Sequence, residues 1–196
     1  SSLVADEAFF LKTSAIIGDK NSLYFSNNKN EFFSMDIETG ALNWKQKINS
    51  NLRPTLIDKY IFTISLEGYL VIIEKDTGNI IRMTDLFRNS KKKFKAFNKY
   101  NPGNFIDGFF AKIPEDSRFY VEDKNKVKKN ISKPTGFIVG KDNIYLSTDH
   151  GRLLIIDISS GLTTSTIKID NKKISRPSVL GNSLFVVTEN SIIKLD

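Results

Sequence analysis

A repeated turn constrains the fold of this chain more strongly than any other feature of its sequence. Three segments, "MDIETG", "IIEKDTG" and "IDISSG", each end a strand-like apolar run and close on Gly40, Gly78 and Gly161. The first two glycines are 38 residues apart, and the last two are 83 apart, which is close to two such units. A period near 40 residues predicts a repeat architecture in which each unit packs against its neighbours.

An acidic residue stands four positions before each of these glycines, and a hydroxyl residue stands directly before it. The carboxylate can accept hydrogen bonds from the backbone N–H groups of a turn, and glycine adopts the positive φ that a tight turn needs. The sequence therefore predicts hairpin turns with a structural role and no chemistry. With the tryptophan that follows the first turn, the predicted turn residues are Asp36, Thr39, Gly40, Trp44, Glu74, Thr77, Gly78, Asp157 and Gly161.

A second signal recurs at the start of each unit, where a basic residue, a proline and a small hydroxyl residue follow one another. It reads Arg53-Pro54-Thr55, Lys133-Pro134-Thr135 and Arg176-Pro177-Ser178, and the first unit offers Lys12-Thr13-Ser14 without the proline. Four short runs rich in Ile, Val, Phe, Tyr and Thr follow in the second unit, at 54–57, 59–65, 68–74 and 79–85. Four strands per 40-residue unit predict an all-β fold, a β-propeller of four-stranded antiparallel blades.

The units divide the chain into about four blades within one propeller domain, 1–196. We expect blades at 8–48, 52–87 and 133–170, and a last blade at 174–196 that lacks its fourth strand. Residues 88–132 are interpreted as a basic insertion or as a degenerate blade. The apolar residues expected between blades are Leu23, Phe25, Ile61, Leu70, Ile72, Ile144, Leu153, Ile155 and Leu184.

The segment "DIETGALNW", Asp36 to Trp44, resembles the repeat of the PQQ-type β-propellers: D-x-x-T-G, then a strand with Trp four residues after the Gly. The other units keep the pattern in part, since Arg82 and Ser165 stand in the Trp position and Glu74 in the Asp position. The tail "DHGRLLIIDISSGLTTSTIKIDNKKISRPSVLGNSLFVVTENSIIKLD" is similar to the closing blade and terminus of the BamB-like family of outer-membrane assembly lipoproteins. This resemblance implies the C-terminal half of a propeller of about eight blades.

The resemblance also implies a function: a non-catalytic, protein-binding scaffold in the periplasm, associated with the outer membrane. Its partner would be the barrel-insertase subunit of the outer-membrane assembly machinery. Half a propeller has two open edges, so we expect further blades elsewhere or self-association through those edges. The segment "EAFFLK", 7–12, is expected to be the outer strand of an absent blade or the strand that closes the last one.

The segment between the second and third units carries the positive charge of the protein. From Arg88 to Lys133 it has 13 Lys/Arg and 5 Asp/Glu, a net charge of +8, whereas the whole chain is +7, so the remainder is −1. Such a segment is a solvated loop or contacts an acidic partner or an anionic membrane surface. We expect no nucleic-acid binding, because no motif for it accompanies the charge. The candidate contact residues are Lys91, Lys92, Lys93, Lys95, Lys99, Lys124, Lys126, Lys128 and Lys129.

The residue inventory predicts no catalytic or metal site. The chain has no Cys and a single His, His150 in a turn, which cannot build a His-based metal centre alone. Quinone-dependent dehydrogenases share the repeat, but Trp44 matches its blade-docking position, so the resemblance implies packing and no cofactor. The alternative function is a ligand- or carbohydrate-binding propeller. Aromatic and amide side chains in one shared pocket would favour that alternative.

Overall fold

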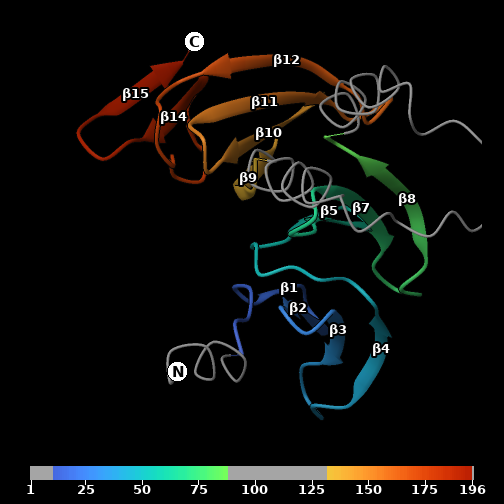
Figure 1. Ribbon diagram of the computed structural model, residues 1–196. Coiled ribbons are helices and arrows are strands. Elements are labelled where there is room, and N and C mark those ends of the chain that lie inside the picture. The colour runs from blue at the N-terminus through green and yellow to red at the C-terminus, as the bar shows by residue number, and fades with distance from the viewer. Residues whose placement is uncertain (1–10, 88–131, 196) are drawn as a thin grey trace, which may run out of the picture. The chain divides into compact units, whose positions relative to one another are not determined.

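The computed structural model describes residues 11–87 and 132–195, which form four antiparallel sheets (Figure 1). The chain divides into two units, 1–86 with 133–196, and 87–132, and the four sheets belong to the first unit. The predicted fold class is confirmed: the protein is all-β, a partial β-propeller with about four blades. Within the described ranges, no helix is long and apolar enough to cross a membrane.

Neighbouring strands pair in chain order within every sheet. The first sheet contains β1 (Ile17–Gly18), β2 (Ser22–Asn27), β3 (Glu31–Asp36) and β4 (Leu42–Gln46). The second contains β5 (Thr55–Ile57), β6 (Tyr60–Ile64), β7 (Tyr69–Glu74) and β8 (Ile80–Asp85). The third contains β9 (Pro134–Val139), β10 (Asn143–Thr148), β11 (Arg152–Asp157) and β12 (Thr163–Lys168). The last has three strands, β13 (Ser178–Leu180), β14 (Ser183–Val187) and β15 (Ile192–Leu195).

The strand register shows that the sheets are true repeats of one unit. The third and fourth strands of the first sheet shift register between Ser34 and Met35, so that Ser34 pairs with Trp44. The same shift occurs once in the second sheet and once in the third. As a result, Arg82 and Ser165 occupy the position of Trp44 in their own sheets. A bulge kept at one place in three sheets aims these side chains in the same way.

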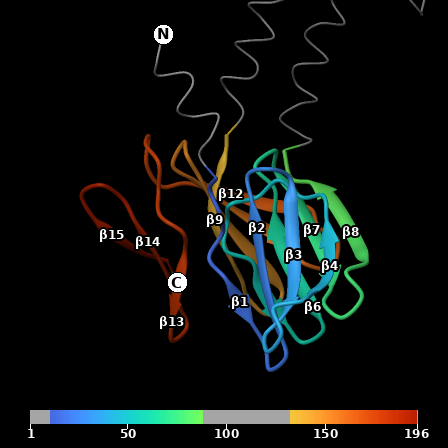
Figure 2. The ribbon, with the colours of Figure 1, turned by 90° about the horizontal axis from the view of Figure 1, so that it is seen from below.

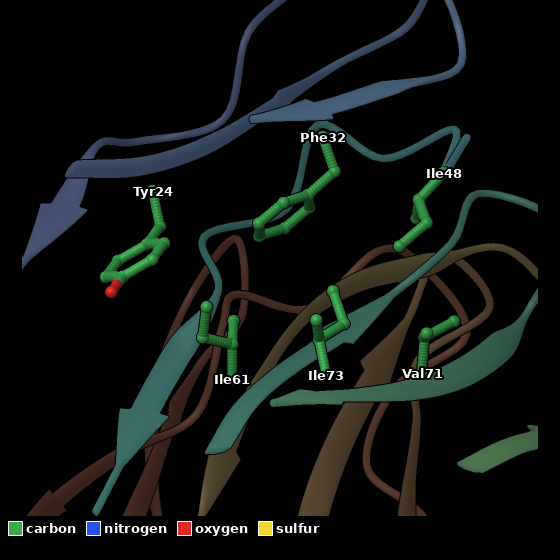
Figure 3. Packing of buried hydrophobic residues seen from close by; sticks show 6 residues of the cluster. All are labelled: Tyr24, Phe32, Ile48, Ile61, Val71 and Ile73. Carbon is green, nitrogen blue, oxygen red and sulfur yellow. The ribbon is translucent and has the colours of Figure 1, made fainter. Parts of the chain in front are cut away.

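An apolar cluster lies between the first and second sheets. Figure 2 shows β2 to β4 in front of β6 and β7. Tyr24 and Phe32 of the first sheet are at most 1% exposed and face Ile61, Val71 and Ile73 of the second. Ile48, in the connection between the sheets, completes the cluster (Figure 3). Burying each of these side chains contributes roughly 1.5–3 kcal/mol, so this interface holds the two sheets together.

The prediction of buried residues is wrong for Leu23, Phe25 and Ile155, which are only half-buried. In a strand, successive side chains point to opposite faces, so the buried Tyr24 turns Leu23 and Phe25 away from the second sheet. No sheet among the described residues covers that outer face. Ile155 lies on the face turned toward the last sheet, which has three strands in the described part of the chain. The other six residues expected in the core are buried.

Candidate functional site

The turn of the first sheet is organised by the carboxylate of Asp36. Its Oδ1 accepts hydrogen bonds from the backbone N–H of Glu38 (3.1 Å) and of Thr39 (2.8 Å) and from the hydroxyl of Thr39 (2.7 Å). Gly40 has a φ of 69° and donates its N–H to the carbonyl of Asp36 at 3.0 Å. These hydrogen bonds, chiefly those from Thr39, lower the pKa of Asp36. The carboxylate of Asp36 therefore has a structural role, which is to stabilise the turn.

The corresponding turn of the third sheet repeats this arrangement. Asp157 Oδ1 accepts hydrogen bonds from the hydroxyl of Ser160 (2.6 Å), its backbone N–H (2.7 Å) and the hydroxyl of Ser159 (2.7 Å). The hydroxyl of Ser160 is the largest cause that lowers the pKa of Asp157 to about 2. In the second sheet the longer Glu74 accepts only the hydroxyl of Thr77, at 2.8 Å, among its described contacts. Glu74 thus keeps the hydrogen bond from the hydroxyl residue that precedes the glycine, as Asp36 and Asp157 do.

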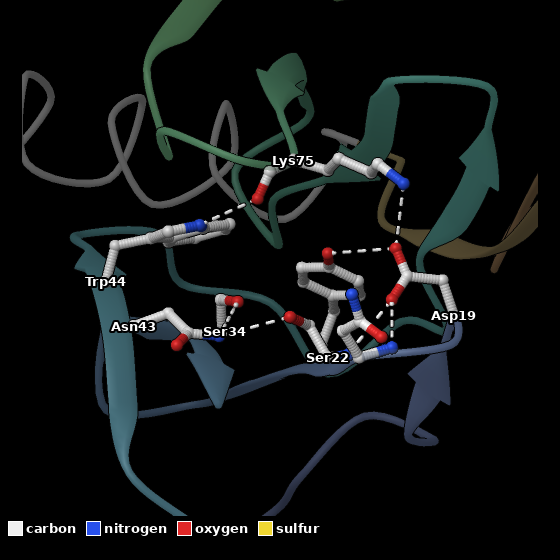
Figure 4. A network of polar contacts seen from close by, with 8 residues as sticks. Asp19, Ser22, Ser34, Asn43, Trp44 and Lys75 are labelled. Carbon is white, nitrogen blue, oxygen red and sulfur yellow. Dashed lines mark hydrogen bonds and ion pairs between the residues drawn. The ribbon is translucent and has the colours of Figure 1, made fainter. Parts of the chain in front are cut away.

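Trp44 attaches the first sheet to the turn of the second. Its indole Nε1–H donates to the carbonyl of Lys75 at 2.8 Å (Figure 4), and Gln46 Nε2 donates to the carbonyl of Gly78 at 2.7 Å. A Cβ on Gly78 would lie 2.6 Å from the indole Cδ2, closer than real Cβ contacts, and Gly78 has a φ of 75°. The glycine is therefore required twice, for its turn conformation and for the indole that covers it.

Arg82 makes the corresponding contact between the second and third sheets. Its two terminal nitrogens donate to the carbonyls of Ile158 and Ser159, both at 2.7 Å. A Cβ on Gly161 would lie 2.8 Å from the hydroxyl of Thr84 on the same strand as Arg82. Arg82 departs from the Trp of the sequence repeat but makes the same kind of contact with the next sheet, because Arg82 and Trp44 both donate to main-chain carbonyls. Ser165, the third member of this position, is exposed.

An ion pair that the sequence did not single out supports the same interface. Lys75 Nζ lies 2.8 Å from Asp19 Oδ2, and the other carboxylate oxygen accepts the N–H groups of Asn21 and Ser22 (Figure 4). Burial raises the pKa of Asp19, but the hydrogen bonds from Lys75, Asn21 and Ser22 outweigh it and lower the pKa to about 2. The two residues are 56 positions apart, so the sequence gives no local signal that they pair.

The outer faces of the two end sheets are apolar. On the first sheet Phe25 stacks on Phe33 with ring centroids 5.2 Å apart, and both are half-buried. The last sheet is more open: Leu180 is 76% exposed, Val187 47% and Ile192 71%. The pairing of β13, β14 and β15 places these three side chains on one face. Val187 and Ile192 pair with each other, and Leu180 lies at the other end of the same face. Exposed large apolar side chains on one face are typical of interaction sites.

A cavity of about 450 Å³ opens at the joint between the first and second sheets. Its polar wall comes from the β2–β3 turn, the connection after β4 and the β6–β7 turn. Its apolar wall comes from the connection after β4 and from strands β7 and β8. Among its polar groups, Asn49 Nδ2 donates to Glu67 Oε1 at 2.6 Å, and Asn49 Oδ1 is buried with no hydrogen-bond partner among the described residues. The lining residues are Asn28, Asn30, Lys47, Ile48, Asn49, Ser65, Glu67, Tyr69, Val71 and Met83.

The remaining sequence candidates contribute no site within the described ranges. His150 is exposed and its Nδ1 lies 2.7 Å from Asp149 Oδ1, in the turn where the sequence places it. The described residues contain no cluster of three or more His, Cys, Asp or Glu side chains that is suited to a metal ion. Residues 7–10 of the expected N-terminal strand and all nine candidate lysines between Lys91 and Lys129 lie outside the described residues.

Comparison with protein families supports the resemblance drawn from the turns. Residues 6–84 match the family model described as outer membrane protein assembly factor BamB. No curated protein sequence matches the chain. The matched segment covers the first two sheets, including the turns at Gly40 and Gly78. The chain therefore carries PQQ-type β-propeller repeats that resemble those of BamB.

Solved structures show the same fold at low sequence identity. The crystal structure of BamB from Moraxella catarrhalis has a TM-score of 0.59 and 12% identity, over 92% of this chain and 41% of that chain. The computationally designed Ika4 protein has a TM-score of 0.57 and 12% identity, over 93% and 91%. The Swd1 β-propeller domain of Myceliophteria thermophila has a TM-score of 0.55 and 11% identity, over 93% and 53%. The chain thus spans less than half of the BamB chain, and the match shows the β-propeller fold.

Proposed function

We propose that this chain is a non-catalytic, protein-binding scaffold of the BamB type that acts in outer-membrane protein assembly in the periplasm. The observation that carries the proposal is the exposed apolar face of the last sheet, formed by Leu180, Val187 and Ile192. The PQQ-type repeats that resemble BamB give the class of scaffold.

The last sheet has the properties of a docking surface for a protein strand. It has three strands where the other sheets have four, and β15 forms its edge among the described residues. An added strand gains main-chain hydrogen bonds at such an edge, and its alternate side chains lie beside Ile192 and extend the apolar face. The partner is therefore a protein with an extended apolar segment, and the candidates are the barrel-insertase subunit and a second copy of this chain.

The basic segment supplies the second part of the proposal. The lysines between Lys91 and Lys129 give it a charge that the rest of the chain does not share. An acidic surface of the partner, or the anionic headgroups of a membrane, would be attracted to these lysines and would bind less tightly as salt rises. This electrostatic contact is separable from the apolar one by its salt dependence.

The test measures binding of the purified barrel-insertase subunit to the immobilised chain by biolayer interferometry, at low and at moderate salt. Ile192→Lys places a charge on the docking face and should reduce affinity at both salt concentrations. Leu162→Lys is the matched control, because Leu162 is 63% exposed in the turn of the third sheet, away from that face. Replacing the nine candidate lysines by Gln should reduce affinity mainly at low salt.

Two results would overturn the proposal. Absence of binding by the folded wild-type chain at low salt would remove the insertase subunit as partner. Equal loss of binding in Ile192→Lys and Leu162→Lys would show that the last sheet is not the docking surface.

A further inference from the structure

The cavity between the first and second sheets has no role in the scaffold function. Its volume of about 450 Å³ lies within the range of roughly 300–1,000 Å³ typical of small-molecule sites. Three asparagine side chains, those of Asn28, Asn30 and Asn49, line it together with Tyr69. They come from both sheets and from the connection between them, so the site exists only when the sheets are docked.

We propose that this cavity binds an uncharged, polyhydroxylated ligand, a mono- or disaccharide. The polar wall is the first reason. A carboxamide offers both a donor and an acceptor, and a sugar hydroxyl is likewise both, so amides match hydroxyls without a net charge. Lys47 and Glu67 line the same cavity with opposite charges, which favours neither an anion nor a cation.

Asn49 is the asparagine whose hydrogen bonding is described most fully. Its Nδ2 is used by Glu67 at 2.6 Å, while its Oδ1 is buried with no hydrogen-bond partner among the described residues. A buried acceptor without a donor is unfavourable, because it has lost its hydration and gained nothing. Asn49 Nδ2 carries a second N–H besides the one donated to Glu67, and a ligand hydroxyl oxygen in the cavity would accept it.

The apolar wall matches the other surface of a sugar. Ile48 and Val71 are 3% and 1% exposed and form its closed part, and Met83 is 55% exposed on β8. Pyranose rings present C–H groups on their faces, which pack on apolar and aromatic side chains such as Tyr69. A phosphate or a free metal ion would gain nothing from these contacts.

The experiment is an amide-resolved NMR titration of the full chain with two probes, maltose and N,N′-diacetylchitobiose, in the millimolar range. We expect saturable shifts for Ile48, Asn49, Glu67 and Tyr69 with at least one probe. Asn49→Ala should weaken binding by about tenfold, the loss expected for one hydrogen bond. Asn190→Ala, which removes an exposed carboxamide from the last sheet's β14–β15 turn, should leave the affinity unchanged.

A second variant keeps the test valid if Asn49→Ala perturbs the interface. Met83 is exposed, so Met83→Lys should fold while removing the exposed part of the apolar wall, and it should also weaken binding. The proposal is overturned if neither probe gives saturable shifts, or if the shifts lie outside the cavity. It is also overturned if N-acetyl-triglycine amide binds at these residues and the sugars do not, since the site would then accept peptide. None of these results bears on insertase binding at the last sheet.

Discussion

The indole of Trp44 lies directly on Gly78 of the neighbouring sheet, so that any side chain at Gly78 would occupy the position of the ring. Gly78 is buried by this contact, whereas Gly40, the same position in the first sheet, is exposed, and a Cβ added there would meet no atom within 4 Å. The two glycines share a positive φ and differ in their surroundings. They therefore separate the cost of backbone conformation from the cost of steric overlap.

Gly78→Ala should lower the free energy of unfolding by about 2–4 kcal/mol, because strained φ and overlap with Trp44 add. Gly40→Ala should lower it by about 1 kcal/mol, since only the φ cost applies. Urea unfolding followed by the fluorescence of the single Trp measures both. Equal losses would contradict the role assigned to the indole.

Arg82→Lys should lower the free energy of unfolding by about 1–2 kcal/mol although the charge is kept. A lysine cannot donate to the carbonyls of Ile158 and Ser159 from two positions at once, as the guanidinium does. Replacement of the exposed Arg152 on β11 by Lys is the control and should change stability by less than about 0.5 kcal/mol. An equal loss of stability in Arg152→Lys would contradict this prediction, because the effect would then not depend on the two carbonyls that Arg82 binds.

Acidification should weaken the joint between the first two sheets through Asp19. Its folded pKa, about 2, lies below the unfolded value of about 3.9, so its stabilisation is present above the unfolded pKa. It is lost as the pH falls through the unfolded value toward 2. Asp19→Asn should therefore lose less stability than wild type between about pH 5 and about pH 2.5 in urea unfolding. The exposed Asp142→Asn should behave as wild type.

Leu180→Glu should reduce self-association of the chain. Leu180 is 76% exposed on β13, on the same face of the sheet as Ile192, and a carboxylate there would have to be desolvated if a second copy covered this face. Sedimentation velocity across a concentration series gives the oligomeric state of both proteins. A wild-type chain that stays monomeric throughout would rule out the second copy as the occupant of this face.

The strands and turns followed from the sequence because their causes are local. The predicted runs of the second unit contain β5 to β8, since β-branched residues and punctuating glycines act within a few positions. Burial was harder to assign. Tyr24 is buried and Phe25 is half-buried because the position of the neighbouring sheet decides which face is covered, and a single strand does not contain that information.

The contacts between sheets were beyond the sequence for a similar reason. Arg82 reads as a departure from the Trp repeat, yet it docks on the next turn as Trp44 does. The cavity draws its residues from separate turns and from a connection with no motif of its own, so Asn49 carries no local signal. The pairing of Asp19 with Lys75 likewise depends on which sheets meet.

Trp44, Gln46 and Arg82 join one sheet to the next by binding main-chain carbonyls: those of Lys75 and Gly78 in one joint, and those of Ile158 and Ser159 in the other. A carbonyl is present whatever the residue, so these hydrogen bonds, unlike the ion pair of Lys75 with Asp19, do not depend on the side chains of the receiving turn. Adjacent repeats are then free to drift apart in evolution, provided that the covered glycine stays. A propeller joined in this way can retain its architecture at the 12% identity that separates this chain from the Moraxella protein.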